Sequence, residues 1–170
     1  MSTAIKKFFS TYKAEAEKAA AGSKVFPETI LSAAYVESAG GKSLLTSKYN
    51  NFFGVKASSS WKGETVALNT KEQTKDGKVY TIKQDFRVYK TPADSFKDYV
   101  SFVSGPRYKK AGVLTASTPE AQIKAIKAAG YATAVNYAEI LIKVLKSSGY
   151  AAVSLVTIFA AALFLGLINR

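Results

Sequence analysis

The chain has 170 residues, 48% of them apolar, so it can form one packed domain with a short additional segment. It contains no cysteine and no histidine, which excludes disulfides, thiol nucleophiles, Ser-His-Asp chemistry and nearly all catalytic zinc sites. The 24 basic residues outnumber the 12 acidic ones and are dispersed without an Arg-rich run, so the net charge of +12 favours an anionic polymer or lipid surface over nucleic acid. We expect neither a metal ion nor a cofactor.

The first part of the chain predicts two helices. Residues 3–21 form an amphipathic pattern that Gly22 ends, and the lysines in it leave no apolar core for a signal peptide. A second helix is expected from Pro27, a residue favoured at the first helical position, to the Gly40-Gly41 pair. Residues 42–60 carry no periodicity and are expected to be irregular.

Residues 61–89 change to a strand pattern, in which apolar and polar residues alternate on both sides of Asp76-Gly77. This dipeptide is a strong hairpin turn signal, so we predict a β-hairpin.

Helical periodicity returns after the hairpin. Thr91-Pro92-Ala93-Asp94 predicts a capped helix start, Thr118 opens a helix that runs to Gly130, and Asn136 is expected to cap a last helix. The apolar faces of the first and last of these three helices consist of Phe96, Tyr99, Val100 and Val103, and of Ile140, Leu141, Val144 and Leu145. One domain is therefore expected over residues 1–147.

The C-terminal residues 148–170 predict a membrane anchor. No charged residue occurs from 147 to 169, and the 18 almost wholly apolar residues 151–168 would span about 27 Å as a helix, close to the hydrocarbon thickness of a bilayer. Tyr150 would lie at the interface, and residues 147–149 would form a hinge. A buried core helix or an oligomerisation hairpin is the alternative.

Glu37 is the candidate for chemistry in the second helix. It shares one helical stripe with Ile30 and Ala34, in the final turn of the helix. Desolvation and the negative end of the helix dipole would both raise the pKa of its carboxyl group, as a general acid requires. The alternative is a solvated glutamate at a frayed helix end.

Several short motifs occur in a fixed order along the chain: Tyr35-Val36-Glu37-Ser38-Ala39-Gly40-Gly41-Lys42-Ser43, Tyr49-Asn50-Asn51-Phe52-Phe53-Gly54-Val55-Lys56, Ser60-Trp61-Lys62-Gly63, Phe86-Arg87-Val88-Tyr89, Ser95-Phe96-Lys97-Asp98-Tyr99, Pro106-Arg107-Tyr108, Gly130-Tyr131-Ala132-Thr133 and Asn136-Tyr137. In this order they resemble the endo-β-N-acetylglucosaminidases of glycoside hydrolase family 73, over roughly residues 10–146. Each motif is weak alone, but the ordered set is specific.

The resemblance implies an α+β fold with a lysozyme-like helical body and a small β-hairpin lobe. It also implies that Glu37 protonates the glycosidic oxygen, with help from Tyr131. The family's second carboxylate corresponds to Glu72, which would activate water or stabilise positive charge on the sugar. The alternative is that Glu72 is only an exposed carboxylate at the end of the hairpin. Glu64 is the nearest rival for the role of second carboxylate, and Asp76 is better explained as a turn residue.

The matching aromatic and amide positions suit sugar binding. We expect them in or beside the cleft, although Phe53 and Tyr137 could equally be core residues. They are Tyr49, Asn51, Phe53, Trp61 and Tyr137.

Two departures from the family pattern stand out. Ala134 and Val135 occupy the places of an aspartate and a proline, which puts full activity in doubt, and Gly40 replaces a frequent tryptophan.

The expected function is hydrolysis of the β-1,4 bond after N-acetylglucosamine in peptidoglycan. A muramidase or lytic transglycosylase that cuts the other linkage, and a non-catalytic wall-binding membrane protein, remain as alternatives. We expect contact with a lipid bilayer through residues 150–168. A single-pass C-terminal anchor without a leader fits the membrane of a bacteriophage virion, with capsid or membrane proteins as partners, or otherwise the bacterial envelope.

Overall fold

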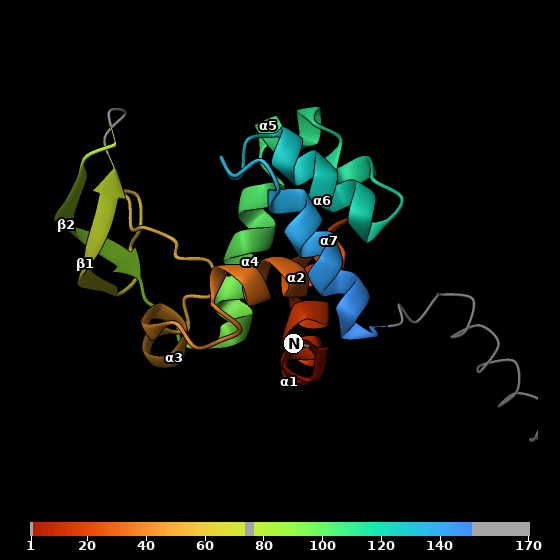
Figure 1. Cartoon of the computed structure of the whole chain (residues 1–170), viewed down its shortest axis with the longest axis horizontal. Coiled ribbons are helices and arrows are strands. Elements are labelled where there is room, and N and C mark those ends of the chain that lie inside the picture. Colours follow the sequence, from red (N-terminus) through yellow and green to blue (C-terminus); the bar gives the residue numbers. More distant parts are fainter. Residues whose placement is uncertain (1, 74–76, 151–170) are drawn as a thin grey trace, which may run out of the picture.

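The structure is a computed structural model that describes residues 2–73 and 77–150, except the side chains of residues 2 and 71–73 (Figure 1). In chain order the elements are α1 (Ser2–Ala20), α2 (Pro27–Glu37), α3 (Leu44–Tyr49), β1 (Thr65–Gln73), β2 (Val79–Arg87), α4 (Pro92–Val103), α5 (Pro106–Lys110), the 3-10 turn η1 (Val113–Thr115), α6 (Pro119–Ala128) and α7 (Tyr137–Ser148). The predicted α+β architecture is confirmed: a helical body carries a two-stranded lobe at one side (Figure 1).

Helix α2 forms the centre of the helical body, where it packs against α1, α4, α6 and α7. Every residue from Glu28 to Ala34 is buried, as expected of a helix that is covered on all sides. An aromatic cluster fills the space between α1, the chain after α3, and α4. Phe52 lies at its middle, with its ring centroid 4.9 Å from Tyr12 and 5.0 Å from Phe96.

The end of α2 is fixed by backbone conformation. Ala39, Gly40 and Gly41 have consecutive positive φ angles of 53°, 67° and 84°, which no α-helix can continue. The Gly40 amide donates to the Tyr35 carbonyl at 2.7 Å, and the Gly41 amide donates to the Ser38 hydroxyl at 2.8 Å. The helix therefore ends at Glu37, with Ser38 as its C-cap residue.

The predicted hairpin is confirmed as an antiparallel pair, in which Thr65 faces Arg87 at the open end and Gln73 faces Val79 at the far end. Asp76 of the predicted turn lies outside the described residues. Near the open end of the hairpin, Phe86 is buried and forms a β-bridge with Lys56, and the Arg87 amide donates to the Val55 carbonyl at 3.0 Å.

Two predictions about local structure were wrong, and a third was confirmed in part. Residues 42–60 are not wholly irregular, because Ser43 caps the short helix α3 through the Thr46 amide at 3.2 Å. Asn136 is the N-cap residue of α7, as predicted, but its side chain makes no capping bond. The predicted hinge at residues 147–149 is mostly helical, because α7 continues to Ser148 and ends at Gly149 with φ 64°. The short helices α3 and α5, of six and five residues, were missed because so few residues show no periodic pattern.

The predicted membrane anchor lies outside the described residues from 151 onward. Within residues 2–73 and 77–150, no helix combines the length and apolar character that crossing a bilayer requires. Tyr150, expected at a membrane interface, packs on α1: its hydroxyl donates to Glu17 at 3.0 Å, and the Lys13 ammonium lies 5.0 Å from its ring centroid.

Candidate active site

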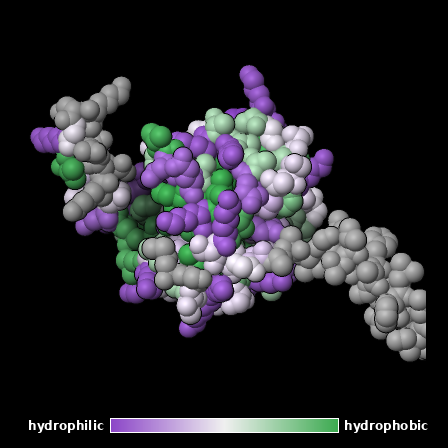
Figure 2. All heavy atoms as spheres, turned by 45° about the vertical axis from the view of Figure 1, so that its right-hand side comes forward, coloured by the Kyte–Doolittle hydropathy of each residue, from purple (hydrophilic) through white to green (hydrophobic). Residues whose placement is uncertain are grey.

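A cleft of about 840 Å³ opens between the base of the hairpin, α4 and the N-terminal half of α7. Figure 2 shows apolar surface where the hairpin meets the helical body, bordered by hydrophilic side chains. The lining residues are Val36, Glu37, Phe53, Val55, Lys56, Arg87, Asp98, Tyr99, Phe102, Tyr131, Ala132, Thr133, Ala134, Tyr137 and Ile140. The cleft therefore combines two carboxylates, two cations and several aromatic rings.

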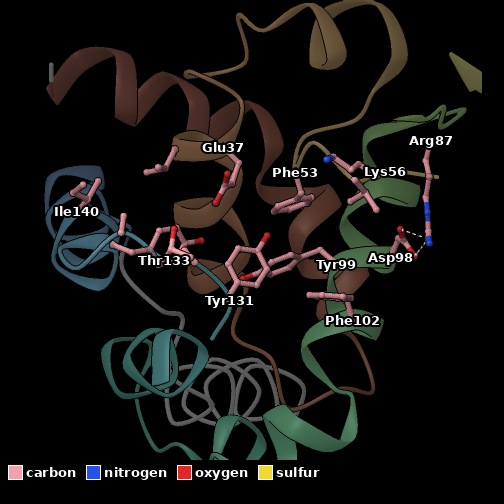
Figure 3. A pocket seen from close by; sticks show the side chains of 15 residues that line it. Glu37, Phe53, Lys56, Arg87, Asp98, Tyr99, Phe102, Tyr131, Thr133 and Ile140 are labelled. Atoms are coloured by element: carbon pink, nitrogen blue, oxygen red, sulfur yellow. Dashed lines mark hydrogen bonds and ion pairs between the residues drawn. The ribbon is translucent and has the colours of Figure 1, made fainter. Parts of the chain in front are cut away.

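Glu37 is the last residue of α2 and points into this cleft, toward the space that Tyr131 also faces (Figure 3). Its side chain remains accessible from the open side of the cleft, but surrounding protein removes enough water to raise the pKa of the carboxyl group above its ordinary value. The Tyr137 hydroxyl lowers this pKa in part, although it makes no hydrogen bond of regular geometry. A carboxyl group that is accessible to substrate and whose pKa is raised can act as a general acid.

Three tyrosines surround the carboxyl group. Tyr131 lies between Tyr99 and Tyr137, with ring centroids 5.7 Å and 5.6 Å away. Burial raises the pKa of all three phenols well above the ordinary value, so each stays protonated at neutral pH. The hydroxyls of Tyr99 and Tyr137 are buried without a hydrogen-bond partner in the described part of the chain.

On the hairpin side, Arg87 at the end of β2 pairs with Asp98 of α4, and both line the cleft (Figure 3). The Tyr89 hydroxyl donates to the same carboxylate at 2.5 Å, and Trp61 stacks on the guanidinium, 4.5 Å from ring centroid to Cζ. This group joins the hairpin to the helical body through charge and ring contacts.

The cleft brings together four of the residues singled out from the sequence: Glu37, Phe53, Tyr131 and Tyr137. Phe53 and Tyr137 are also buried, so each belongs to the core and to the cleft floor at once.

Asn51, Tyr49 and Trp61 do not line the cleft. Asn51 is 1% exposed, and its amide holds backbone together: Nδ2 donates to the carbonyls of Val55 and Arg87 at 3.0 and 2.9 Å, and Oδ1 accepts from the Val55 amide at 2.9 Å. The carbonyl of Tyr49 accepts from the Tyr89 amide at 3.0 Å, which again joins the hairpin end to the body.

The two candidates for the second carboxylate lie on or before β1. The backbone of Glu72 pairs with Tyr80 near the far end of the hairpin, and its side chain lies outside the described part of the structure. Glu64 is exposed and precedes β1, and its carbonyl accepts from the Trp61 indole at 3.0 Å.

The segment that departs from the family pattern forms one rim of the cleft. Ala134 lines the cavity, and the side chain of Val135 is 93% exposed. The Lys127 ammonium donates to the Ala132 carbonyl at 2.7 Å and so holds the start of this segment against α6.

Sequence reasoning missed several lining residues. Ile140 was predicted on an apolar helix face and is 40% exposed in the cleft. Phe102 gave no signal of its own. Lys56, Arg87 and Asp98 lie within the motifs that carried the resemblance, but the Arg87–Asp98 pair across 11 residues becomes visible only in the folded chain.

Comparisons with known proteins relate the chain to a family of glycoside hydrolases. Residues 13–149 match the glucosaminidase family, described as mannosyl-glycoprotein endo-β-N-acetylglucosaminidase. The chain is 36% identical over 138 residues to the peptidoglycan hydrolase FlgJ of Escherichia coli K12, which covers 78% of this chain and 43% of that protein. It is 38% identical over 119 residues to the exo-glucosaminidase LytG of Bacillus subtilis 168, which covers 68% of this chain and 41% of that protein.

The solved, C-terminally truncated glycoside hydrolase domain of FlgJ from Salmonella typhimurium superposes with a TM-score of 0.72 at 34% identity, covering 87% of this chain and 99% of that one. The chain spans less than half the length of the curated relatives FlgJ and LytG. The family match, which includes every lining residue of the cleft, and the shared lysozyme-like fold show that the chain belongs to the glucosaminidase family, glycoside hydrolase family 73.

Proposed function

We propose that the chain is a peptidoglycan hydrolase that cleaves the β-1,4 bond after N-acetylglucosamine, with Glu37 as the general acid. The observation that carries this proposal is the position of Glu37: an accessible carboxyl group of raised pKa in the wall of a long cleft, within a glucosaminidase-family fold. Related proteins are named peptidoglycan hydrolase and exo-glucosaminidase.

The chemistry assigned to Glu37 is proton donation to the oxygen that leaves with the aglycone sugar. The protonated phenol of Tyr131, which is only partly buried beside this carboxyl group, can donate to a substrate oxygen, whereas the hydroxyls of Tyr99 and Tyr137 are buried. The net charge of +12 attracts an anionic wall polymer over long range.

The second carboxylate is proposed to be Glu72. Asp98 is the other carboxylate of the cleft, but both of its oxygens accept from Arg87, and one also accepts from Tyr89. Three hydrogen bonds hold the Asp98 side chain in place, so Asp98 suits a positioning role. Glu72 on the hairpin would then activate water or stabilise the oxocarbenium-like transition state.

Glu37→Gln tests the proposal, because it keeps size and hydrogen bonding but removes the transferable proton. The variant should clear purified peptidoglycan at least about 100-fold more slowly than the wild type. Glu139→Gln, which neutralises an exposed carboxyl group on α7, is the matched control and should keep full activity. Undiminished clearing of peptidoglycan by a Glu37→Gln variant with unchanged thermal unfolding would overturn the assignment of Glu37 as the general acid. If the wild type itself clears no peptidoglycan, a non-catalytic wall-binding protein is favoured instead.

The linkage is tested by the reducing ends of the products. Mass spectrometry after borohydride reduction should find reduced N-acetylglucosamine. Reduced N-acetylmuramic acid would identify a muramidase instead, and anhydro sugars would identify a lytic transglycosylase.

For localisation we propose a membrane anchor formed by residues 151–168, which contain no charged residue. We favour the membrane of a bacteriophage virion over a bacterial envelope. The full chain should float with liposomes, whereas a chain ended after Tyr150 should not. Detection of the protein in purified particles, or its absence from them, decides between the two membranes.

A further inference from the structure

Phe102 is a large apolar side chain left uncovered in the wall of the cleft. It is 53% exposed, on the last turn of α4, and lies near Tyr131 (Figure 3). The Phe102 ring centroid is 6.1 Å from that of Tyr131 and 5.4 Å from that of Tyr108. Rings of this kind, fixed by their neighbours on one side and open on the other, are typical of binding surfaces. The open face of Phe102 can stack on a pyranose ring.

Arg107 of α5 lies beside this ring. Its guanidinium carbon is 5.5 Å from the Phe102 ring centroid and 4.6 Å from that of the buried Tyr108, and Nη2 donates to the Tyr108 hydroxyl. The residue is exposed, and it takes part in no ion pair with the described residues. Since a guanidinium has five N–H donors, Arg107 has several left for a ligand.

On the basis of the proposed function, we infer that Phe102 and Arg107 form a subsite for a sugar unit that carries a carboxylate. Phe102 stacks on the pyranose ring, and Arg107 pairs with the carboxylate at the margin of the cleft. In peptidoglycan, such a unit is the muramic sugar that alternates with N-acetylglucosamine.

The charges around the pair permit an anion there. Asp98 lies one helical turn before Phe102, but its charge is balanced by Arg87. Lys109 and Lys110 follow Arg107 on α5 and are exposed. An anionic sugar therefore meets positive charge beyond Phe102.

The carboxylate has two possible sources. In glycan without peptides it is the lactyl carboxylate of the muramic sugar itself. In glycan that carries stem peptides the lactyl group is amidated, and the carboxylates belong to the peptide. The chemistry is the same, and the ligands of the experiment separate the two sources.

Binding by the full chain with Glu37→Gln, measured by calorimetry, tests this inference without turnover. The ligands are a peptide-free tetrasaccharide of alternating N-acetylglucosamine and N-acetylmuramic acid, the same tetrasaccharide with its carboxylates reduced to alcohols, and its peptide-bearing form. Adding Arg107→Gln should weaken binding of a carboxylate ligand about fivefold to tenfold and leave the reduced ligand unchanged. An Arg107 effect on the peptide-free ligand assigns the lactyl carboxylate, and an effect on the peptide-bearing ligand alone assigns the stem.

Lys110→Gln, which removes the same charge from the same helix, is the control and should change binding less than twofold. Phe102→Ala should weaken all three ligands, because stacking does not need the carboxylate. A loss in Arg107→Gln that is as large on the reduced ligand as on the carboxylate ligands, no loss on any ligand, or no binding of any ligand, would overturn the inference. If binding discriminates but the wild type cleaves nothing, the subsite stands and the hydrolytic function fails.

Discussion

Both carboxylate oxygens of Asp98 accept hydrogen bonds from Nη1 of Arg87, at 3.0 and 2.8 Å, and this pair spans the boundary between the hairpin and the helical body. Arg87 is the last residue of β2 and Asp98 lies in the middle of α4. Because both side chains line the cleft, we infer that the ion pair fixes the position of the hairpin relative to Glu37.

Replacing Asp98 with Asn should therefore affect activity as well as stability. We expect a loss of about 1–3 kcal/mol in the free energy of unfolding, since the guanidinium loses its charged partner in a partly buried site. Urea unfolding and the kcat and KM for wall fragments measure the two effects. Asp85→Asn, at an exposed position on β2, should change neither. A stable Asp98→Asn variant with wild-type kinetics would contradict the positioning role.

Asn51→Ala should destabilise the protein by about 2–4 kcal/mol. Three hydrogen bonds are lost, and the backbone groups of Val55 and the Arg87 carbonyl lose their partner in a buried site. Chemical unfolding measures the loss, and Asn69→Ala, exposed on β1, is the control. If Asn51→Ala keeps its stability but loses affinity for glycan, Asn51 is a sugar ligand after all.

Glu28→Gln should stabilise the protein at neutral pH. Desolvation raises the pKa of the buried Glu28 carboxyl group, and Glu120 and Glu17 raise it further, against a hydrogen bond from its own backbone amide and the charge of Lys13. The folded chain therefore holds this proton more tightly than the unfolded chain, and stability falls as pH rises through the folded pKa. The melting temperature of Glu28→Gln should exceed that of the wild type at pH 7 and approach it at pH 3.5. Glu64→Gln, which changes an exposed carboxyl group, should show no such pH-dependent gain.

Tyr137→Phe should raise the pKa of Glu37, because the Tyr137 hydroxyl is the group that favours the charged carboxylate. The alkaline limb of the pH–rate profile, where the general acid is lost, should move to higher pH. Thermal stability should not fall, since this hydroxyl is buried without a regular partner. Tyr131→Phe should leave the limb in place, and a shift to lower pH in Tyr137→Phe would contradict the coupling.

The sequence predicts those elements whose signals are local. Thr91 and Asp94 form the full capping box that their spacing indicates, and the alternation of residues 61–89 becomes the paired strands. The position of Glu37 in the last turn of α2 also follows from the glycines after it.

The rest depends on contacts between distant segments. Gln122 has a helical position and no motif, yet its buried amide bonds to the backbone of Lys24, Phe26 and Val113 and so holds the start of α2. The same reason hides the role of Asn51, which looks like a sugar ligand by residue type but serves the backbone. A side chain that stabilises a turn far away leaves no periodic trace in the sequence.

The glycine run after Glu37 has a consequence for variation in this cleft. A Cβ on Gly40 would lie 3.2 Å from a ring carbon of Tyr35, at a φ of +67° that L-residues rarely adopt, and one on Gly41 would lie 3.4 Å from Phe8. The position of Glu37 in the cleft is thus set by the main-chain conformation of the residues that follow it, and less by the side chains around it. Mutations along the rim, such as those at Ala134 and Val135, can retune which glycans are accepted while the proton donor keeps its place.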